Sequence, residues 1–268
     1  MPKETLALLK EYQKLKLSQN IDYDKFNRYS IVHHSTSIEG STLTEIETRL
    51  LLDEGMTPKG KPLEHSIMTT DHLKALIFII SAAEKKQEIT PGFIQQINAK
   101  VMSGTGKVYT TVFGDVDNSK GMYRKGNVTA GSMYFVNYDK VESLTIKLCK
   151  TINQKISKCK SITDQLNLSF DSHFDLVSIH PFYDGNGRTS RLLMNFIQLY
   201  FKLPMAIVFK EDKGYYIKAL TDSRTMESLS PFRDFMYSQY NKFLKQDIDA
   251  YKLMLKPKNK GKGFSIIF

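Results

Sequence analysis

The sequence predicts a mainly α-helical fold with one small β-hairpin, and three observations support this prediction. Helix-capping signals and apolar residues at helical spacing recur along most of the chain. Residues 108–137, by contrast, are rich in Gly, Thr, Tyr and Val, which is typical of a short hairpin or an extended flap. Strand and helix signals do not alternate and no internal repeat is visible, which argues against a doubly wound α/β sheet.

The first half of the chain carries three helix signals. Residues 23–38 are expected to form a helix. Thr44 and Glu47 then form a capping box before a leucine-rich stretch that stops at Gly55. The dipeptide 90–91 is Thr-Pro, which places a cap before a proline at the first helical position.

The hairpin is expected over residues 128–136, where the composition favours strands around Gly131. Asp139 and Glu142 follow, and they are expected to open a helix that runs to about residue 157. Together these signals predict a small β element that leads directly into a long helix.

The second half contains further helices. Ser161 with Asp164 opens one of them, and its apolar positions recur at helical spacing. Another contains Leu192, Leu193, Phe196, Ile197 and Tyr200. That helix ends before Pro204, and Ser230 with Pro231 starts the last helix of the chain.

Composition and charge describe an ordinary globular protein with a basic end. The chain has 268 residues, of which 41% are hydrophobic and 25% are charged, so it can bury a core and need not be disordered. The net charge is +10, but residues 252–268 hold five lysines and no acidic residue. Half of the excess therefore lies in one tail, which is more typical of a solvated end than of a phosphate-binding arm.

Cysteine usage and the N-terminal sequence favour a cytoplasmic location. Cys149 and Cys159 are too few for a disulfide framework or a four-cysteine zinc site. The first twenty residues are charged throughout and lack the apolar stretch of a signal peptide. The longest apolar run, residues 75–83, is far below the ~20 residues of a membrane span. We therefore expect no membrane partner.

The densest polar cluster in the sequence is IHPFYDGNGRTSR, residues 179–191. His180 precedes a proline and is expected to end a helix, and the loop then leads into another helix. Gly185 and Gly187 would let the backbone approach a ligand closely. The free N–H groups at the start of the second helix form an anion site, and Arg188 and Arg191 lie three residues apart beside it.

Two further residues of this cluster suit phosphoryl chemistry. Asp184 offers a hard oxygen ligand for Mg²⁺ that bridges phosphates. His180, with an ordinary pKa of ~6.5, can remove a proton from a hydroxyl at neutral pH. A glycine loop between helices is often only a turn, but a base, an acid, glycines and two arginines in one short stretch favour a nucleotide site.

The sequence resembles the Fic-domain proteins. Residues 180–191, HPFYDGNGRTSR, match the HPFxDGNGRxxR signature of that family without a departure. Residues 121–124, GMYR, resemble the stretch before the family's flap, and residues 128–136 resemble the flap itself. Residues 216–220 are similar to a later helix that borders the nucleotide. The resemblance covers about residues 90–240 and implies a Fic-type helical bundle with a β-hairpin flap beside the active-site loop.

This resemblance implies that the chain is an enzyme, a protein adenylyltransferase that moves AMP from MgATP to a hydroxyl of a target protein or of itself. His180 would deprotonate the target hydroxyl, and Asp184 would hold Mg²⁺. Arg188 would bind the β-phosphate and Arg191 the γ-phosphate. The resemblance further implies three sets of supporting residues: the phosphate cradle of Gly185, Asn186 and Gly187, the base-side Tyr216, and the flap residues Val128, Thr129, Ala130 and Gly131 that position the target.

An N-terminal segment resembles the inhibitory (S/T)xxxE(G/N) motif of the same family. Here it reads Ser35-Thr36-Ser37-Ile38-Glu39-Gly40. The resemblance implies that Glu39 pairs with Arg191, where its carboxylate would compete with the γ-phosphate and misalign ATP. Such glutamates are also linked to the removal of AMP, and the sequence does not decide which direction dominates. The simpler alternative is that Gly40 only caps a helix.

The predicted organisation has an N-terminal helical region at residues 1–89, a Fic domain at 90–240 and a helix end with a basic tail at 241–268. Two alternatives stay open: a Fic-fold transferase that uses another nucleotide or group donor, and a nucleic-acid-binding regulator without catalysis. Nucleic acid is not the favoured partner, because residues 1–89 contain no clear basic recognition helix. The N-terminal helices could support a homodimer.

Overall fold

The computed structural model describes residues 2–17, 21–130 and 133–255. Its fold is mainly helical, as predicted. The α-helices are α1 Pro2–Lys14, α2 Ile21–Ile38, α3 Glu45–Glu54, α4 Leu63–Glu84, α5 Pro91–Val101, α6 Val141–Ile156, α7 Ile162–Ile179, α8 Asn186–Tyr200, α9 Lys213–Thr225 and α10 Ser230–Leu255. The strands are β1 Val108–Tyr109, β2 Val116–Asp117, β3 Thr129–Ala130 and β4 Met133–Tyr134.

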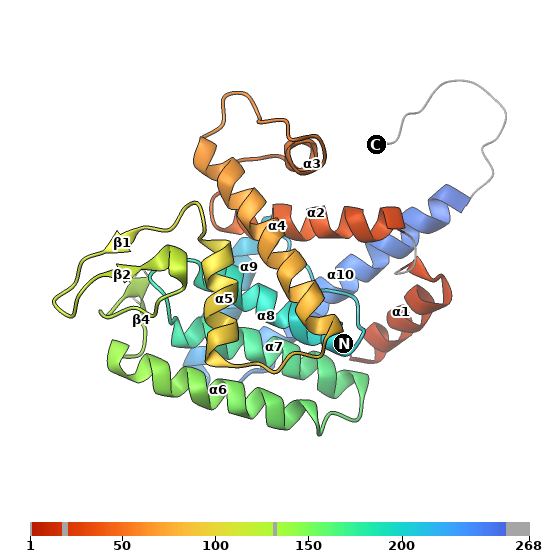
Figure 1. Cartoon of the computed structure of the whole chain (residues 1–268). Coiled ribbons are helices and arrows are strands. Elements are labelled where there is room, and N and C mark those ends of the chain that lie inside the picture. The colour runs from red at the N-terminus through yellow and green to blue at the C-terminus, as the bar shows by residue number, and fades with distance from the viewer. Residues whose placement is uncertain (1, 18–20, 131–132, 256–268) are drawn as a thin grey trace.

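Helix α8 lies at the centre of the molecule, enclosed by α4, α5 and α7 (Figure 1). Its residues from Arg188 to Gln198 are all buried. This explains why the sequence of α8 combines large apolar residues with polar ones that hydrogen-bond internally. For example, Gln198 donates to Ser169 Oγ at 3.2 Å and accepts from the Ala206 N–H at 2.7 Å. The loop that begins α8 is therefore anchored to the best-packed helix of the fold.

Most predicted helix starts are confirmed by their capping geometry. Thr44 and Glu47 form a complete capping box, and α3 ends at Gly55 with a left-handed backbone. Ser161 and Asp164 form a second capping box at the start of α7. Thr90 Oγ1 accepts a hydrogen bond from the Phe93 N–H at 3.1 Å. These starts are determined by local chemistry, which is why the sequence alone reveals them.

The helix expected to open at Asp139 and Glu142 is confirmed as α6, but Asp139 does not cap it. Asp139 lies within a short 3₁₀ helix, Tyr138–Lys140, and α6 begins after it with no side-chain hydrogen bond at its cap position. The 3₁₀ turn stacks directly on the first turn of α6. The chain therefore enters this helix through backbone geometry instead of through a carboxylate cap.

The structure contains two helices and one strand pair that the sequence signals do not reveal. Helix α1 is highly charged, and it packs on α10 through a 2.7 Å hydrogen bond from Thr5 Oγ1 to Asn241 Oδ1. Helix α4 is apolar on most sides, so its pattern lacks a clear 3.6-residue period. The pair β1–β2 is only two residues long on each strand, beside the predicted pair β3–β4. The expectation of one hairpin is corrected to two antiparallel pairs.

By length and composition alone, α4 is apolar enough to cross a membrane. Its position gives a different reason for that composition, because it packs against α2, α5 and α8 (Figure 1). Ala75, Leu76 and Ile79 are fully buried in the core. The apolar character of α4 is therefore that of a central core helix.

Two other predictions concern segments at the edge of the description. The basic tail predicted at the end of the chain lies outside the described residues from 256 onward. Cys149 is buried, Cys159 is half-buried, and both are free thiols. The cytoplasmic location stays a prediction.

Candidate functional site

The site begins where α7 ends, at His180. The His180 N–H still donates to the Leu176 carbonyl at 3.0 Å, but its backbone is left-handed, with φ of 52° and ψ of 59°. The following Pro181 disfavours the helical region for His180, so the predicted end of the helix is confirmed. The chain leaves through the left-handed region instead of the extended one. This left-handed backbone, uncommon for a residue other than glycine, ends α7 and begins the loop that leads to α8.

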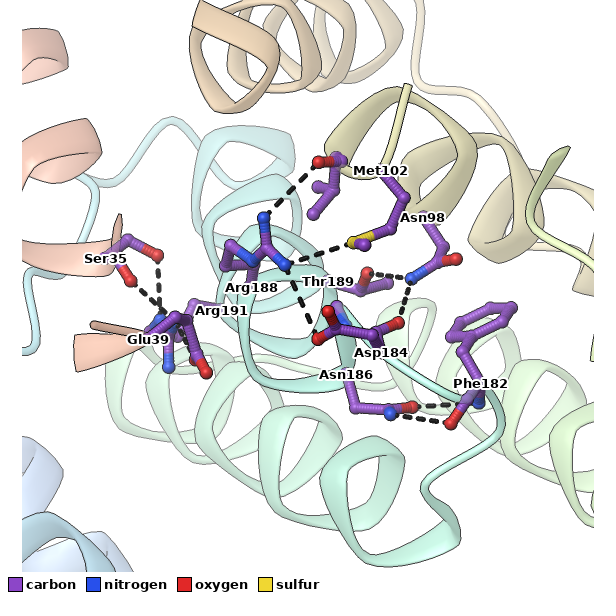
Figure 2. Close-up of polar contacts among 12 residues, drawn as sticks. Ser35, Glu39, Asn98, Met102, Phe182, Asp184, Asn186, Arg188, Thr189 and Arg191 are labelled. Atoms are coloured by element: carbon purple, nitrogen blue, oxygen red, sulfur yellow. Dashed lines mark hydrogen bonds and ion pairs between the residues drawn. The ribbon is translucent and has the colours of Figure 1, made fainter. Parts of the chain in front are cut away.

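Hydrogen bonds close the loop after His180 onto the start of α8 (Figure 2). Asn186 Oδ1 accepts from the Phe182 N–H at 3.0 Å, and Asn186 Nδ2 donates to the Phe182 carbonyl at 2.8 Å. Phe182 itself is fully buried, so it anchors the loop in the core. Because its side-chain amide is engaged within the loop, the contribution of Asn186 to a phosphate cradle falls to its backbone N–H.

Asn98 of α5 fixes the loop from the opposite side. Its Nδ2 donates to the Asp184 carbonyl at 3.1 Å and to Thr189 Oγ1 at 3.2 Å. Gly185 lies between these contacts with φ of 80°, which favours glycine. A Cβ at Gly185 would lie 2.7 Å from Asn98 Nδ2 and 2.9 Å from Met102 Sδ. The loop can approach α5 this closely only because residue 185 is glycine.

Arg188 lies on the first turn of α8 and is 2% exposed. Its Nη2 donates to Met102 Sδ at 3.1 Å, its Nη1 approaches the Val101 carbonyl at 3.4 Å, and it lies 3.6 Å from an Asp184 oxygen. Burial lowers the pKa of Arg188, and the nearby carboxylates oppose this effect. Among the described residues, Arg188 Nε has no hydrogen-bond partner. This buried cation therefore has donor capacity left for an anion.

Asp184 is the exposed acid of the loop, with 57% of its side chain accessible. Its Oδ1 accepts from the Gly185 N–H at 2.5 Å. No group of three or more His, Cys, Asp or Glu side chains that could hold a metal occurs within the described ranges. An accessible carboxylate beside an anion site nevertheless fits Mg²⁺, which commonly takes one protein carboxylate and completes its shell with phosphates and water.

Arg191 is buried and is held by the end of α2, so the structure brings together the residues of the predicted inhibitory motif (Figure 2). Its Nε donates to Ser35 Oγ at 2.9 Å, and its Nη2 donates to the Ser35 carbonyl at 3.0 Å. The same Nη2 forms an ion pair with Glu39 Oε1 at 2.6 Å. A Cβ at Gly187 would clash with Glu39 Oε1, so the carboxylate lies directly over the glycine at the start of α8.

The electrostatics of the Glu39–Arg191 pair favour its charged form. Burial acts to raise the pKa of Glu39, but the Arg191 guanidinium outweighs burial, and the pKa lies below its ordinary value. The Glu39 side chain is 31% exposed, so one side of the ion pair faces solvent. Gly40 follows with φ of 106° and donates to the Ser37 carbonyl at 3.1 Å. The helix-ending role of Gly40 and the pairing of Glu39 therefore coexist.

The imidazole of His180 lies in a water-poor environment. Burial lowers its pKa from 6.5 to about 4, and Arg124 and Arg224 act in the same direction. A hydrogen bond with the Val177 backbone and the charge of Glu39 oppose this shift. The ring is therefore neutral over the whole neutral pH range. A neutral imidazole at the edge of an anion site can accept a proton from a hydroxyl.

The predicted flap forms the strand pair β3–β4, with Thr129 opposite Tyr134. Val128 is half-buried, and Thr129 and Ala130 are exposed. Gly131, the fourth residue predicted for target positioning, lies outside the described residues. Arg124 connects this flap to the loop, because its Nε donates to the His180 carbonyl at 2.8 Å and its Nη1 donates to the Gly126 carbonyl at 2.8 Å.

Tyr216 lies in α9, and its side chain is close to Arg191 of α8. It is 2% exposed, and its hydroxyl lies 2.8 Å from His173 Nε2. Its ring is therefore enclosed by the protein and offers no exposed surface to a nucleotide base, whereas the neighbouring Tyr215 is 71% exposed. The hydroxyl of Tyr216 faces the same buried region as Arg191 and affects the pKa of that guanidinium.

Sequence reasoning gave no role to Asn98, Met102 or Arg124. Their functions depend on contacts between segments that lie 56 to 91 residues apart in the chain. The only available signal was that Arg124 ends the GMYR stretch and that Asn98 and Met102 follow the cap at Thr90. Nothing local distinguishes these residues from ordinary surface or core positions.

Comparison with known proteins agrees with this geometry. Residues 88–198 match the Fic/DOC family. The chain is 32% identical over 187 residues to the protein adenylyltransferase Fic of Drosophila persimilis, an alignment that covers 69% of this chain and 34% of that protein. The chain thus spans about a third of the length of the curated relatives that it matches.

Solved structures share the fold across nearly the whole chain. A Fic-domain-containing signaling protein from Bacteroides thetaiotaomicron superposes with a TM-score of 0.80 at 24% identity, covering 93% of this chain and 98% of that one. Fic-1 from C. elegans superposes with a TM-score of 0.77 at 22% identity, covering 94% of this chain and 73% of that one. The fold is therefore that of the Fic-domain structures, as the resemblance implied, and the family match over residues 88–198 shows that this chain contains a Fic domain.

Proposed function

We propose that this protein is a protein adenylyltransferase, which transfers AMP from MgATP to a hydroxyl of a target protein. The observation that carries the proposal is the junction of α7 and α8. There a neutral His180 stands beside a helix N-terminus with two buried arginines, Arg188 and Arg191, each of which keeps a nitrogen without a partner in the described part of the chain. The relatives named protein adenylyltransferase Fic support the same activity.

In the proposed reaction, His180 accepts the proton of the target hydroxyl. The hydroxyl oxygen forms a bond to the α-phosphorus, the bond from that phosphorus to the bridging oxygen breaks, and pyrophosphate leaves. The loop contributes positioning and charge stabilisation instead of a covalent intermediate. The depressed pKa of His180 leaves the base unprotonated and ready at neutral pH.

The anion site would hold the triphosphate. The N–H groups at the start of α8 and the spare donors of Arg188 and Arg191 are suited to its oxygens. Asp184 would hold Mg²⁺, which when bound neutralises charge on the phosphates. Arg188 and Arg191 would bind the leaving pyrophosphate and so favour its departure.

We further propose that Glu39 keeps the enzyme in a low-activity state. Its 2.6 Å ion pair with Arg191 uses the guanidinium edge that a γ-phosphate would need. ATP bound beside this pair would sit displaced, and a displacement of ~1 Å can cost ~100-fold in rate. The same carboxylate, placed over Gly187, is also suited to act on AMP-modified protein, so removal of AMP at this site is included in the proposal.

Intact-mass spectrometry of the Glu39→Gly variant tests the activity and its donor. The variant is incubated with Mg²⁺, a cell lysate and one of ATP, GTP, UTP or CTP, and both the variant and lysate proteins are analysed. We expect a mass gain of one AMP with ATP alone, and none in the Glu39→Gly, His180→Ala double variant. A gain of UMP with UTP, a gain of phosphate with ATP, or no mass gain with ATP would contradict the proposal.

A further inference from the structure

An aromatic side chain of the flap lies flat on the imidazole of His180. Phe135 follows β4, and its ring centroid is 3.8 Å from that of His180 with 19° between the ring planes. This is a parallel stack at van der Waals contact, so no water fits between the two rings. One whole face of the imidazole is therefore covered by the flap.

The flap is held in this place by two arginines from different elements. Arg124 donates from Nη2 to the Val136 carbonyl at 2.5 Å and from Nε to the His180 carbonyl at 2.8 Å. It therefore connects the residue after Phe135 to His180. Arg224 of α9 donates to Met133 Sδ and to Ser178 Oγ, both at 3.2 Å. The Arg224 guanidinium also lies 6.0 Å from the centre of the Phe135 ring. Arg124 and Arg224 thus both hold the flap against the end of α7.

His180 requires such external support. It is a non-glycine residue with φ of 52°, a conformation that costs energy and persists only where the surroundings hold it. The Arg124 hydrogen bond fixes its carbonyl, but Phe135 is the group in stacked contact with its ring. Support of the backbone and support of the side chain therefore come from different residues.

We propose that Phe135 is a positioning residue, which holds the His180 imidazole in one orientation and shields it from water so that it meets the target hydroxyl as a neutral base. This inference rests on the proposed transferase function. With one face covered, the imidazole is open to a substrate only through its edge and its other face. The flap then serves the base itself as well as the target.

The charged groups around His180 agree with this role. Arg124 of the pre-flap segment and Arg224 of α9 disfavour the imidazolium, whereas Glu39 at the end of α2 favours it. Burial is the largest cause of the lowered pKa, and the stacked Phe135 ring is part of the surface that buries the imidazole. Loss of the aromatic ring would admit water to this face without changing any of the three charges.

NMR titration of the His180 ring tests the shielding without any need for catalysis. The signal is assigned by its absence in His180→Asn and followed in the full chain with Phe135→Leu, Phe135→Met, Phe135→Tyr and the control Tyr134→Leu. Tyr134 is the adjacent flap residue and is 84% exposed. We expect the pKa of His180 to rise by about one unit or more in the Leu and Met variants, and to stay at its parent value in the Tyr variant and the control.

The same substitutions in the Glu39→Gly background test the positioning. We expect kcat for AMP transfer to fall at least about tenfold in Phe135→Leu with little change in the KM for ATP, and the acid limb of kcat/KM to move to higher pH. Phe135→Tyr should restore both. A His180 titration that is unchanged in folded Leu and Met variants overturns the proposal. A shifted titration in a protein that transfers no AMP supports the shielding by Phe135 and overturns the transferase function instead.

Discussion

Three acceptor atoms, two from Ser35 and one from Glu39, bind the Arg191 guanidinium. Its Nε binds the Ser35 hydroxyl, and its Nη2 is shared between the Ser35 carbonyl and Glu39. Charge-assisted hydrogen bonds of this kind are short and strong, and they fix the plane of the guanidinium. The contact that we propose to be inhibitory is therefore made by two residues at the end of α2, with Glu39 supplying the charge and Ser35 the orientation.

We expect Ser35→Ala to activate AMP transfer partially, because Arg191 loses the acceptor at Nε and releases ATP from the competing geometry more readily. The Ser35 carbonyl and Glu39 still bind Nη2 in this variant, so the rate should rise about 10-fold, which is the lower limit of the ~1.5–3 kcal/mol of a hydrogen bond to a charged group and less than with Glu39→Gly. The matched control is Ser37→Ala on the same helix, whose hydroxyl has no partner within the described residues. Incorporation of labelled AMP that is equal in both serine variants would refute the role of Ser35.

At the scale of elements, the sequence predicts best what is decided locally. The capping boxes at Thr44 and Ser161, the helix end at His180 and the start of α8 follow from residues a few positions apart. The sequence does not reveal α4, because this helix is apolar on most sides and lacks a clear period. It does not reveal β1–β2 either, because strands of two residues are too short to give a pattern. The loop after His180 lies between these cases. Its residue types predict a phosphate-binding loop, but the sequence does not show that Asn98 of α5 closes it.

The internal closure of that loop makes a prediction about Asn186. Replacement by Ala removes both hydrogen bonds to Phe182, which should cost about 2–3 kcal/mol of stability and weaken ATP binding through a disordered phosphate loop. Asn195→Ala is the control on the same helix, since Asn195 donates to the Ala206 carbonyl at 2.9 Å, far along the helix from the loop. It should lower the unfolding temperature but not ATP affinity measured by calorimetry. Loss of ATP binding in both variants would contradict this division.

At the scale of the whole molecule, α4 and α2 join the N-terminal region to the Fic domain. Helix α4 packs on α5 and α8, and α2 contacts α8, so Glu39 at the end of α2 reaches Arg191 of α8. His33 and His34 of α2 are buried packing residues. His34 Nδ1 accepts from the Lys210 N–H at 3.2 Å, and His33 Nδ1 lies 3.2 Å from Thr48 Oγ1. The sequence alone does not show that these polar side chains are buried, because their hydrogen-bond partners come from other segments of the chain.

These buried histidines make the fold sensitive to acid. Burial lowers the pKa values of His33 and His34 from 6.5 to about 4, so each is neutral in the folded protein and protonated in the unfolded chain between these values. Stability is therefore complete above about pH 6.5 and is lost as the pH falls toward 4, by about 2 kcal/mol for each histidine at pH 5. Urea unfolding at pH 7 and pH 5 should show this loss, and His34→Gln should reduce it. A free energy of unfolding that is equal at both pH values would refute this view of the core.

The most direct test of the account is the rate of AMP transfer with and without the Glu39 carboxylate. Labelled AMP incorporation from MgATP is compared in the parent, Glu39→Gln, Glu39→Gly and the Glu39→Gly, His180→Ala double variant. We predict low incorporation in the parent, an intermediate rate for Gln, a rate about 100-fold above the parent for Gly, and none in the double variant. Equal incorporation in the parent and Glu39→Gly, or persistent transfer without His180, would contradict the central claim that Glu39 restrains a His180-dependent adenylyltransferase through Arg191.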